Sequence, residues 1–137
     1  MTMDYIRIAS YNSTGLSDLK IEYVQNFIAK NNIDIMFLQE TWLLPTNIQR
    51  LGLIHKDYQY CAVSGVRDNE LLRGRPYGGA AIMWHNSLTK YVTRLREIRS
   101  KRLCGVILDS GKSKLLMLNC YLPCDNFSKS NASHNFY

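Results

Sequence analysis

A short apolar run that ends in a single carboxylate is the feature that most constrains this chain. Five of the six residues from 33 to 38 are apolar, and Gln39 and Glu40 follow them. Strands that are covered on both faces have such nearly continuous apolar sequences, so the run predicts a buried strand. Sites in open α/β sheets lie at the carboxyl ends of the strands, which is where this pattern places Glu40.

A second strand and a helix are predicted just upstream. The segment 5–11 predicts a strand that ends in Asn12, and Ser17 is the expected N-cap of a helix that runs to about residue 30. The buried stripe of this helix is expected to consist of Ile21, Val24, Phe27 and Ile28. Two strands joined by a helix predict a βαβ unit with parallel strands. Asn12 and Glu40 would then lie at one sheet edge, where their oxygen atoms suit a hard divalent cation.

Downstream of these elements the pattern changes to short strands. They are expected over 58–63, 80–84, 91–98, 103–109 and 114–121. Residues 110–112 predict the turn of a hairpin between the last two strands. The segment 43–55 is expected to be a loop with a helical turn around 47–51, and 68–76 a mobile polar loop.

Positive charge is concentrated in one segment. Residues 67–102 hold nine basic and three acidic side chains, a net charge of +6 that equals the formal charge of the whole chain. Seven of the nine are arginines, whose planar guanidinium groups suit phosphate contacts. A solvated surface is the plainer interpretation, but we favour a polyanionic partner such as nucleic acid.

The chain is expected to be intracellular and without a membrane segment. No apolar run reaches eighteen residues, and the N-terminus lacks the basic and apolar regions of a signal peptide.

Four motifs occur in the order and spacing of a known superfamily. They are SYN at 10–12, FLQETW at 37–42, YGGAAIMW at 77–84 and LNCYLP at 118–123. With them the chain resembles the endonuclease/exonuclease/phosphatase superfamily, and it looks most like the endonucleases of non-LTR retrotransposons. The resemblance implies an α/β (α+β) sandwich with the two-sheet, four-layer deoxyribonuclease I-like fold. It covers only the N-terminal half of that domain, residues 1–123, and leaves 124–137 as a polar tail.

The resemblance also assigns roles to individual residues. Glu40 matches the metal-binding glutamate and Asn12 the amide beside the metal, which would be Mg²⁺ with Mn²⁺ as the alternative. Tyr121 matches a tyrosine that contacts the scissile phosphate, and Asn119 belongs to the same motif. From the residues alone, Asn12 also fits a plain turn residue and Tyr121 a core aromatic residue.

DNA is the partner that the resemblance implies. Basic side chains near the motifs are expected to contact it, namely Arg73, Arg75, Lys101 and Arg102. A retrotransposon origin would imply a nuclear location, and a longer product would supply the C-terminal half and a reverse transcriptase domain.

The chain departs from the family after residue 121. The glycine-aspartate-x-asparagine block, the late aspartate and the serine-aspartate-histidine ending of the family have no match, so the general base is absent. We therefore expect the 137-residue chain to be an inactive fragment with an apolar hairpin at 103–122 that is partly uncovered. The alternatives are a non-catalytic nucleic-acid-binding remnant, or a phosphatase or lipid phosphodiesterase of the same superfamily.

Overall fold

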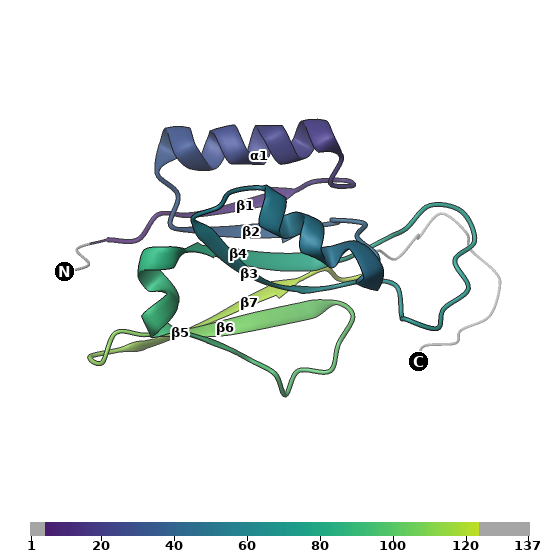
Figure 1. Cartoon of the computed structure of the whole chain (residues 1–137). Coiled ribbons are helices and arrows are strands. Elements are labelled where there is room, and N and C mark those ends of the chain that lie inside the picture. The colour runs from purple at the N-terminus through teal and green to yellow at the C-terminus, as the bar shows by residue number, and fades with distance from the viewer. Residues whose placement is uncertain (1–4, 124–137) are drawn as a thin grey trace, which may run out of the picture.

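The structure, a computed structural model, describes residues 5–123 (Figure 1). Its strands are β1 (Ile8–Asn12), β2 (Ile35–Gln39), β3 (Tyr58–Val63), β4 (Ala80–His85), β5 (Val92–Arg94), β6 (Leu103–Asp109) and β7 (Lys114–Cys120). Its helices are the α-helix α1 (Asp18–Asn31) and the 3-10 helices η1 (Pro45–Leu53) and η2 (Asn86–Tyr91). The predicted polar tail, 124–137, lies outside the described residues.

The strands form two sheets. The first sheet has the order β1-β2-β4-β3, with β1 parallel to β2 and the other pairs antiparallel. Helix α1 joins the parallel pair, which confirms the predicted βαβ unit. Asn12 lies opposite Gln39 in that pair, so both strands end at the same edge. The second sheet, β5-β6-β7, is antiparallel throughout.

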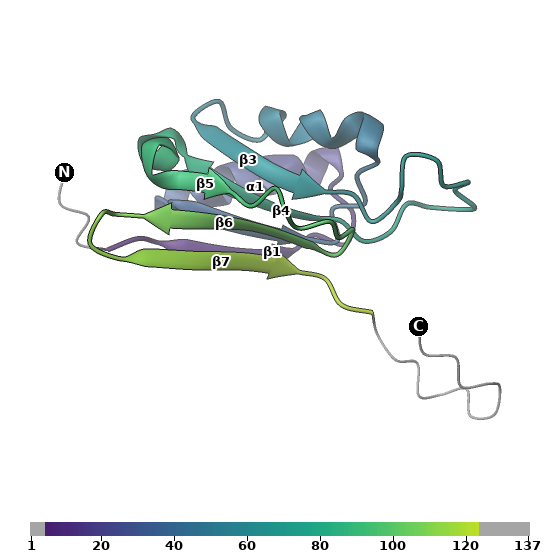
Figure 2. The ribbon, with the colours of Figure 1, turned by 90° about the horizontal axis from the view of Figure 1, so that it is seen from below.

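The apolar run of β2 is explained by layers on both sides of the first sheet. Helices α1 and η1 cover one face, and the second sheet packs against the other (Figures 1 and 2). Alternation along β2 sends Met36 and Leu38 toward the helices and Ile35 and Phe37 toward the second sheet. The strand is therefore buried on both faces, as its sequence predicted.

Helix α1 packs on the sheet through the stripe expected from its periodicity. Val24 and Ile28 are fully buried, and Ile21 and Phe27 are packed against the same core. The helix ends where Asn32 adopts a left-handed conformation with a φ of 50°. Asparagine tolerates that conformation better than most residues, so the chain can turn there into β2.

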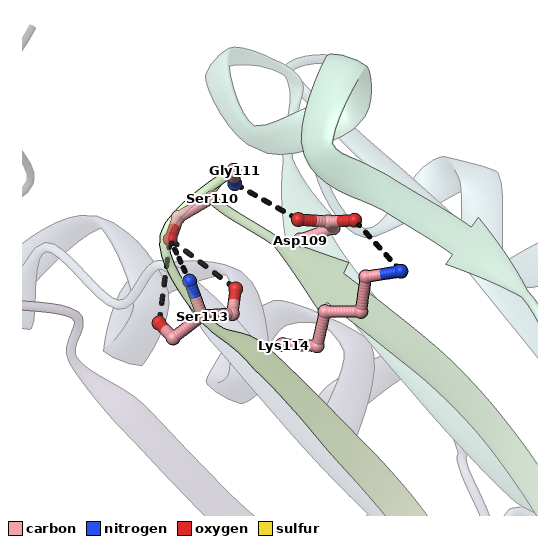
Figure 3. A network of polar contacts seen from close by, with 5 residues as sticks. All are labelled: Asp109, Ser110, Gly111, Ser113 and Lys114. Atoms are coloured by element: carbon pink, nitrogen blue, oxygen red, sulfur yellow. Dashed lines mark hydrogen bonds and ion pairs between the residues drawn. The ribbon is translucent and has the colours of Figure 1, made fainter.

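The hairpin between β6 and β7 forms at the predicted turn. The Ser110 hydroxyl accepts a hydrogen bond from the Ser113 backbone N–H at 3.2 Å, and the Asp109 carboxylate accepts one from the Gly111 backbone N–H at 2.8 Å (Figure 3). Lys114 lies 3.4 Å from the other Asp109 oxygen. The Gly111 N–H and the Lys114 ammonium group lower the pKa of Asp109. This network sets the register in which Asp109 pairs with Lys114.

The described residues build three layers of the expected four. No helix in this part of the chain covers the outer face of β6 and β7, where Leu116 is 56% and Leu118 46% exposed. Strand β7 is also the edge of its sheet. The expectation of exposed apolar surface on the hairpin is thus confirmed.

The strand predicted over 91–98 was wrong in its extent. Tyr91 ends η2, and β5 covers only Val92–Arg94. The Leu95 backbone N–H still bonds to the Gly105 carbonyl oxygen at 3.0 Å, but Arg96 and Glu97 beyond it are exposed. Charged side chains without an apolar face to bury do not hold a segment in the sheet.

Smaller differences concern the ends of elements, and β1 begins at Ile8 rather than at residue 5. Strand β7 ends at Cys120, so Tyr121 lies just beyond it, and η1 is longer than the predicted turn at 47–51. No helix in the described part of the chain is long and apolar enough to cross a membrane.

Candidate functional site at the ends of β1 and β2

Glu40 is held at the end of β2 through its own backbone. Its φ of 50° lies in the left-handed region, which non-glycine residues adopt where surrounding contacts enforce it. The Glu40 carbonyl oxygen accepts hydrogen bonds from the Ser13 hydroxyl at 2.9 Å and from the Gly15 backbone N–H at 2.7 Å. These bonds tie the end of β2 to the loop after β1, so both strands position the carboxylate.

The structure brings Asn12 and Glu40 together. The Asn12 amide nitrogen donates a hydrogen bond to the Glu40 carboxylate at 3.2 Å, although the residues are 28 positions apart. The Asn12 amide oxygen accepts a hydrogen bond from the Thr14 backbone N–H at 3.1 Å. Asn12 thus orients the carboxylate, and its amide oxygen serves the turn that follows β1.

The Glu40 carboxylate fits a Mg²⁺ ion that keeps most of its water. Mg²⁺ commonly uses one or two protein carboxylates together with waters and substrate phosphates, and Mn²⁺ accepts the same oxygen ligands. Glu40 is partly exposed and supplies one such carboxylate. The described residues contain no group of three or more His, Cys, Asp or Glu side chains that could enclose an ion. Any Mg²⁺ held here would take its other ligands from water and substrate.

Asn119 connects the second sheet to the strand that carries Glu40. Its amide nitrogen donates hydrogen bonds to the carbonyl oxygens of Leu38 at 2.8 Å and Ala81 at 2.7 Å. Its amide oxygen accepts one from the Gln39 side chain at 2.8 Å. Because Asn119 is buried and uses both ends of its amide, it fixes the distance between the sheets next to the site.

Gln39 is a site residue that the sequence did not single out. Besides Asn119, its side-chain nitrogen contacts the Ser10 hydroxyl at 3.0 Å, so it links β1, β2 and β7. The available signal was its place on β2: alternation puts it on the face toward the second sheet, next to Glu40.

Tyr121 lies at the same edge of the sandwich. Its backbone N–H donates to the Arg102 carbonyl oxygen at 2.9 Å. A Cβ on Gly78 would be 3.7 Å from the Tyr121 ring, so the ring lies directly beside that glycine. The Gly78 carbonyl oxygen accepts the backbone N–H of Trp42 at 2.9 Å, which connects Tyr121 to the segment that follows Glu40.

The indole of Trp42 is enclosed between two neighbours. A Cβ on Gly15 would be only 2.3 Å from the indole, so only glycine leaves room for the ring there. The guanidinium carbon of Arg75 lies 4.2 Å from the indole ring centroid. Arg75, predicted as a nucleic-acid contact, therefore contacts Trp42, which follows Glu40 by two positions in the sequence.

The loop between β3 and β4 is folded onto itself near the site. The Tyr77 hydroxyl donates a hydrogen bond to Glu70, and the Arg67 backbone N–H donates another at 3.0 Å. These two donors lower the pKa of Glu70, and the Glu70 carboxylate raises the pKa of Tyr77. Lys101 lies with its ammonium nitrogen 5.9 Å from the Tyr77 ring centroid.

The four basic residues predicted to contact nucleic acid differ in whether they touch the site. Arg75, Lys101 and Arg102 contact residues of the Glu40 edge or of the loop beside it, whereas Arg73 is exposed on that loop. A cleft of about 400 Å³ opens beyond the end of β3. Its lining includes the cations Arg67, Arg99 and Lys101.

The sequence matches a family model over nearly its whole length. The model is described as the Endonuclease/Exonuclease/phosphatase family, and the match covers residues 9–135. A search of the curated proteins gives no match.

Solved structures of similar fold are about twice as long as the region that this chain matches. The 3' phosphatase NExo from Neisseria, bound to product DNA hairpin, is 22% identical with a TM-score of 0.58, and the match covers 85% of this chain and 41% of that one. The endonuclease domain of TRAS1, a telomere-specific non-LTR retrotransposon, is 12% identical with a TM-score of 0.64, covering 86% and 46%.

An AP endonuclease, LMAP from Leishmania major, is similar to the same extent. It is 19% identical with a TM-score of 0.63, and the match covers 86% of this chain and 40% of that one. At these identities the likeness establishes the fold. The chain spans less than half the length of each of these three structures.

Proposed function

The chain belongs to the endonuclease/exonuclease/phosphatase family, and from this premise we propose that it forms the cation-binding half of a phosphodiester hydrolase that acts on DNA. The observation that carries the proposal is the hydrogen bond of 3.2 Å between Asn12 and Glu40 at the ends of two parallel strands. The finer assignment, a retrotransposon-type endonuclease, rests on QETW at 39–42 and on GRPYGGAAIMW at 74–84, which extends the YGGAAIMW motif by three residues.

DNA is the favoured substrate because the cations of the basic segment form no ion pairs within the described residues. The ion pairs of the described residues join Arg50 to Asp18 and Lys114 to Asp109, and neither involves residues 67–102. A polyanion that contacts these side chains gains from the release of its counterions. The Neisseria phosphatase, whose structure contains a product DNA hairpin, supports the same substrate class.

Each residue of the site has a distinct part in this proposal. Bound Mg²⁺ would act as a Lewis acid on the phosphate. Glu40 would hold the cation, and Asn12 keeps the carboxylate oriented. Tyr121 would place its hydroxyl near the scissile phosphate. Asn119 and Gln39 keep the end of β2 at a fixed distance from β7.

The 137-residue chain alone is proposed to bind DNA without cleaving it. Hydrolysis needs a group that removes a proton from the attacking water, and such a group commonly contributes a factor of about 10²–10⁴. No residue of the site described above is a free carboxylate or histidine placed beside Glu40 for this task.

The test combines DNA binding with plasmid nicking. Wild type should bind a labelled duplex more tightly when Mg²⁺ replaces EDTA, because Glu40 would hold a cation that attracts the phosphate. Glu40→Gln should lose that increment, and Glu70→Gln, which alters a loop carboxylate, should retain it. Supercoiled plasmid should stay intact with all three proteins.

The outcomes separate the alternatives. Binding that ignores both Mg²⁺ and Glu40→Gln would indicate the non-catalytic remnant. Preference for anionic lipid vesicles over DNA would indicate the lipid phosphodiesterase or phosphatase. Nicking that disappears in Glu40→Gln would establish an active nuclease and overturn the proposed inactivity.

A further inference from the structure

The Trp42–Arg75 pair lies beside the candidate site and has no part in holding the cation. The Arg75 guanidinium carbon is 4.2 Å from the indole centroid, which is well within the range of a cation–π contact. Trp42 itself is fixed, because its backbone N–H bonds to Gly78 at 2.9 Å and its ring presses on Gly15. A flexible arginine of an exposed loop is therefore anchored to a rigid surface two residues from Glu40.

Stacking leaves the hydrogen-bonding capacity of Arg75 available. The face of a guanidinium group contacts the aromatic ring, whereas its five N–H donors point outward in the guanidinium plane. Within the described residues, neither a hydrogen bond nor an ion pair engages the Arg75 guanidinium. Arg73, two positions earlier on the same loop, is exposed and stacks on no ring in that part of the chain.

We propose that Trp42 is a positioning residue that presents the edge of Arg75 to a nucleic-acid phosphate next to the one bound at Glu40. This inference rests on the proposed function. It gives Trp42 a role that neither the charge distribution nor the QETW motif assigns to it. Arg75 would thereby differ from Arg73: it contributes a defined phosphate contact, and Arg73 contributes only diffuse charge.

A double-mutant cycle tests the coupling between the two residues. Affinity for a labelled DNA duplex is measured by fluorescence anisotropy over a series of salt concentrations for wild type, Arg75→Ala, Trp42→Leu and the double variant. Arg75→Ala should weaken binding about tenfold and reduce the slope of log K against log salt by about 0.9, the value for one lost phosphate contact. Trp42→Leu should weaken binding severalfold although no charge is lost, and it should have no further effect in the Arg75→Ala background.

Two further variants keep the test decisive if Trp42→Leu fails to fold. Arg75→Lys retains the charge but loses the planar group, so it should keep the salt slope of wild type and bind severalfold more weakly. Arg73→Ala, the matched control, should weaken binding less than twofold. Equal losses for Arg73→Ala and Arg75→Ala, or full affinity in Arg75→Lys, would overturn the inference. A wild type that does not bind DNA would instead overturn the proposed function.

Discussion

Asn119 donates a hydrogen bond of 2.8 Å to the carbonyl oxygen of Leu38, and with it the second sheet is joined to the first across 81 positions of sequence. The same amide nitrogen also serves Ala81, so a nonpolar side chain here leaves two carbonyl oxygens and the Gln39 amide without this partner.

Replacing Asn119 should therefore destabilise the fold. We expect Asn119→Leu to lower the free energy of unfolding by about 2–3 kcal/mol, because buried acceptors lose their donor. Urea denaturation followed by circular dichroism measures the loss. Cys120→Ser, at an exposed position on the same strand, should stay within about 0.5 kcal/mol of wild type. Equal stability of the two variants would contradict the role of Asn119 between the sheets.

Gly15 and Gly111 provide a matched pair for testing the packing of Trp42. Both have a φ near 85°, but an added Cβ meets the Trp42 ring at 2.3 Å in the first case and nothing within 4 Å in the second. Gly111→Ala should cost about 1–2 kcal/mol from backbone strain alone. Gly15→Ala should cost more and should change Trp42 fluorescence, because the indole must move. Thermal melts of the two variants give the comparison, and similar melting temperatures would refute it.

Tyr58 should make the stability depend on pH in the alkaline range. Burial, assisted by the carboxylates of Asp34 and Asp57, raises its pKa to about 12, and its hydroxyl donates to the Ile33 carbonyl oxygen. An unfolded tyrosine ionises near pH 10. The folded state keeps the proton longer, so this contribution is complete below pH 10 and is lost between pH 10 and 12.

The Tyr58 contribution amounts to roughly 3 kcal/mol by linkage, because each unit between the two pKa values is worth about 1.4 kcal/mol. Tyr58→Phe cannot ionise, so it should be less stable at pH 8 and lose less stability than wild type between pH 9 and 11. Urea midpoints across this range measure the difference. Parallel curves for the two proteins would show that Tyr58 does not titrate as inferred.

The uncovered leucines of β7 should promote self-association. Leu116 is exposed on an edge strand that has no described neighbour on its outer side, which is a template for pairing with another chain. Leu116→Lys should shift the protein toward monomer in size-exclusion chromatography, with stability changed by about 0.5 kcal/mol or less. Thr93→Lys adds the same charge on the opposite edge strand, β5, and should leave association unchanged. An equal shift in both variants would assign the effect to net charge.

Much of the fold could be predicted because it depends on neighbours along the chain. Short local patterns predict three of its elements, namely the apolar run of β2, the buried stripe of α1 and the turn at residues 110–113. The parallel pairing of β1 and β2 follows from the helix between them. The meeting of Asn12 with Glu40 follows in turn, since parallel strands end at one edge.

Other features depended on the packing of the two sheets, which no local pattern encodes. The sequence alone determined that the Glu40 carboxylate and the Asn12 amide would lie at one sheet edge. It also determined that arginines are concentrated in residues 67–102. Only the tertiary structure decided which arginine is anchored on Trp42, that β5 stops at Arg94, and that Asn119 and Gln39 meet. The two contacts join residues that are 33 or more positions apart. The end of β5 depends on whether a side chain finds an apolar face to bury. Such choices are settled by close packing across the whole core rather than by periodicity.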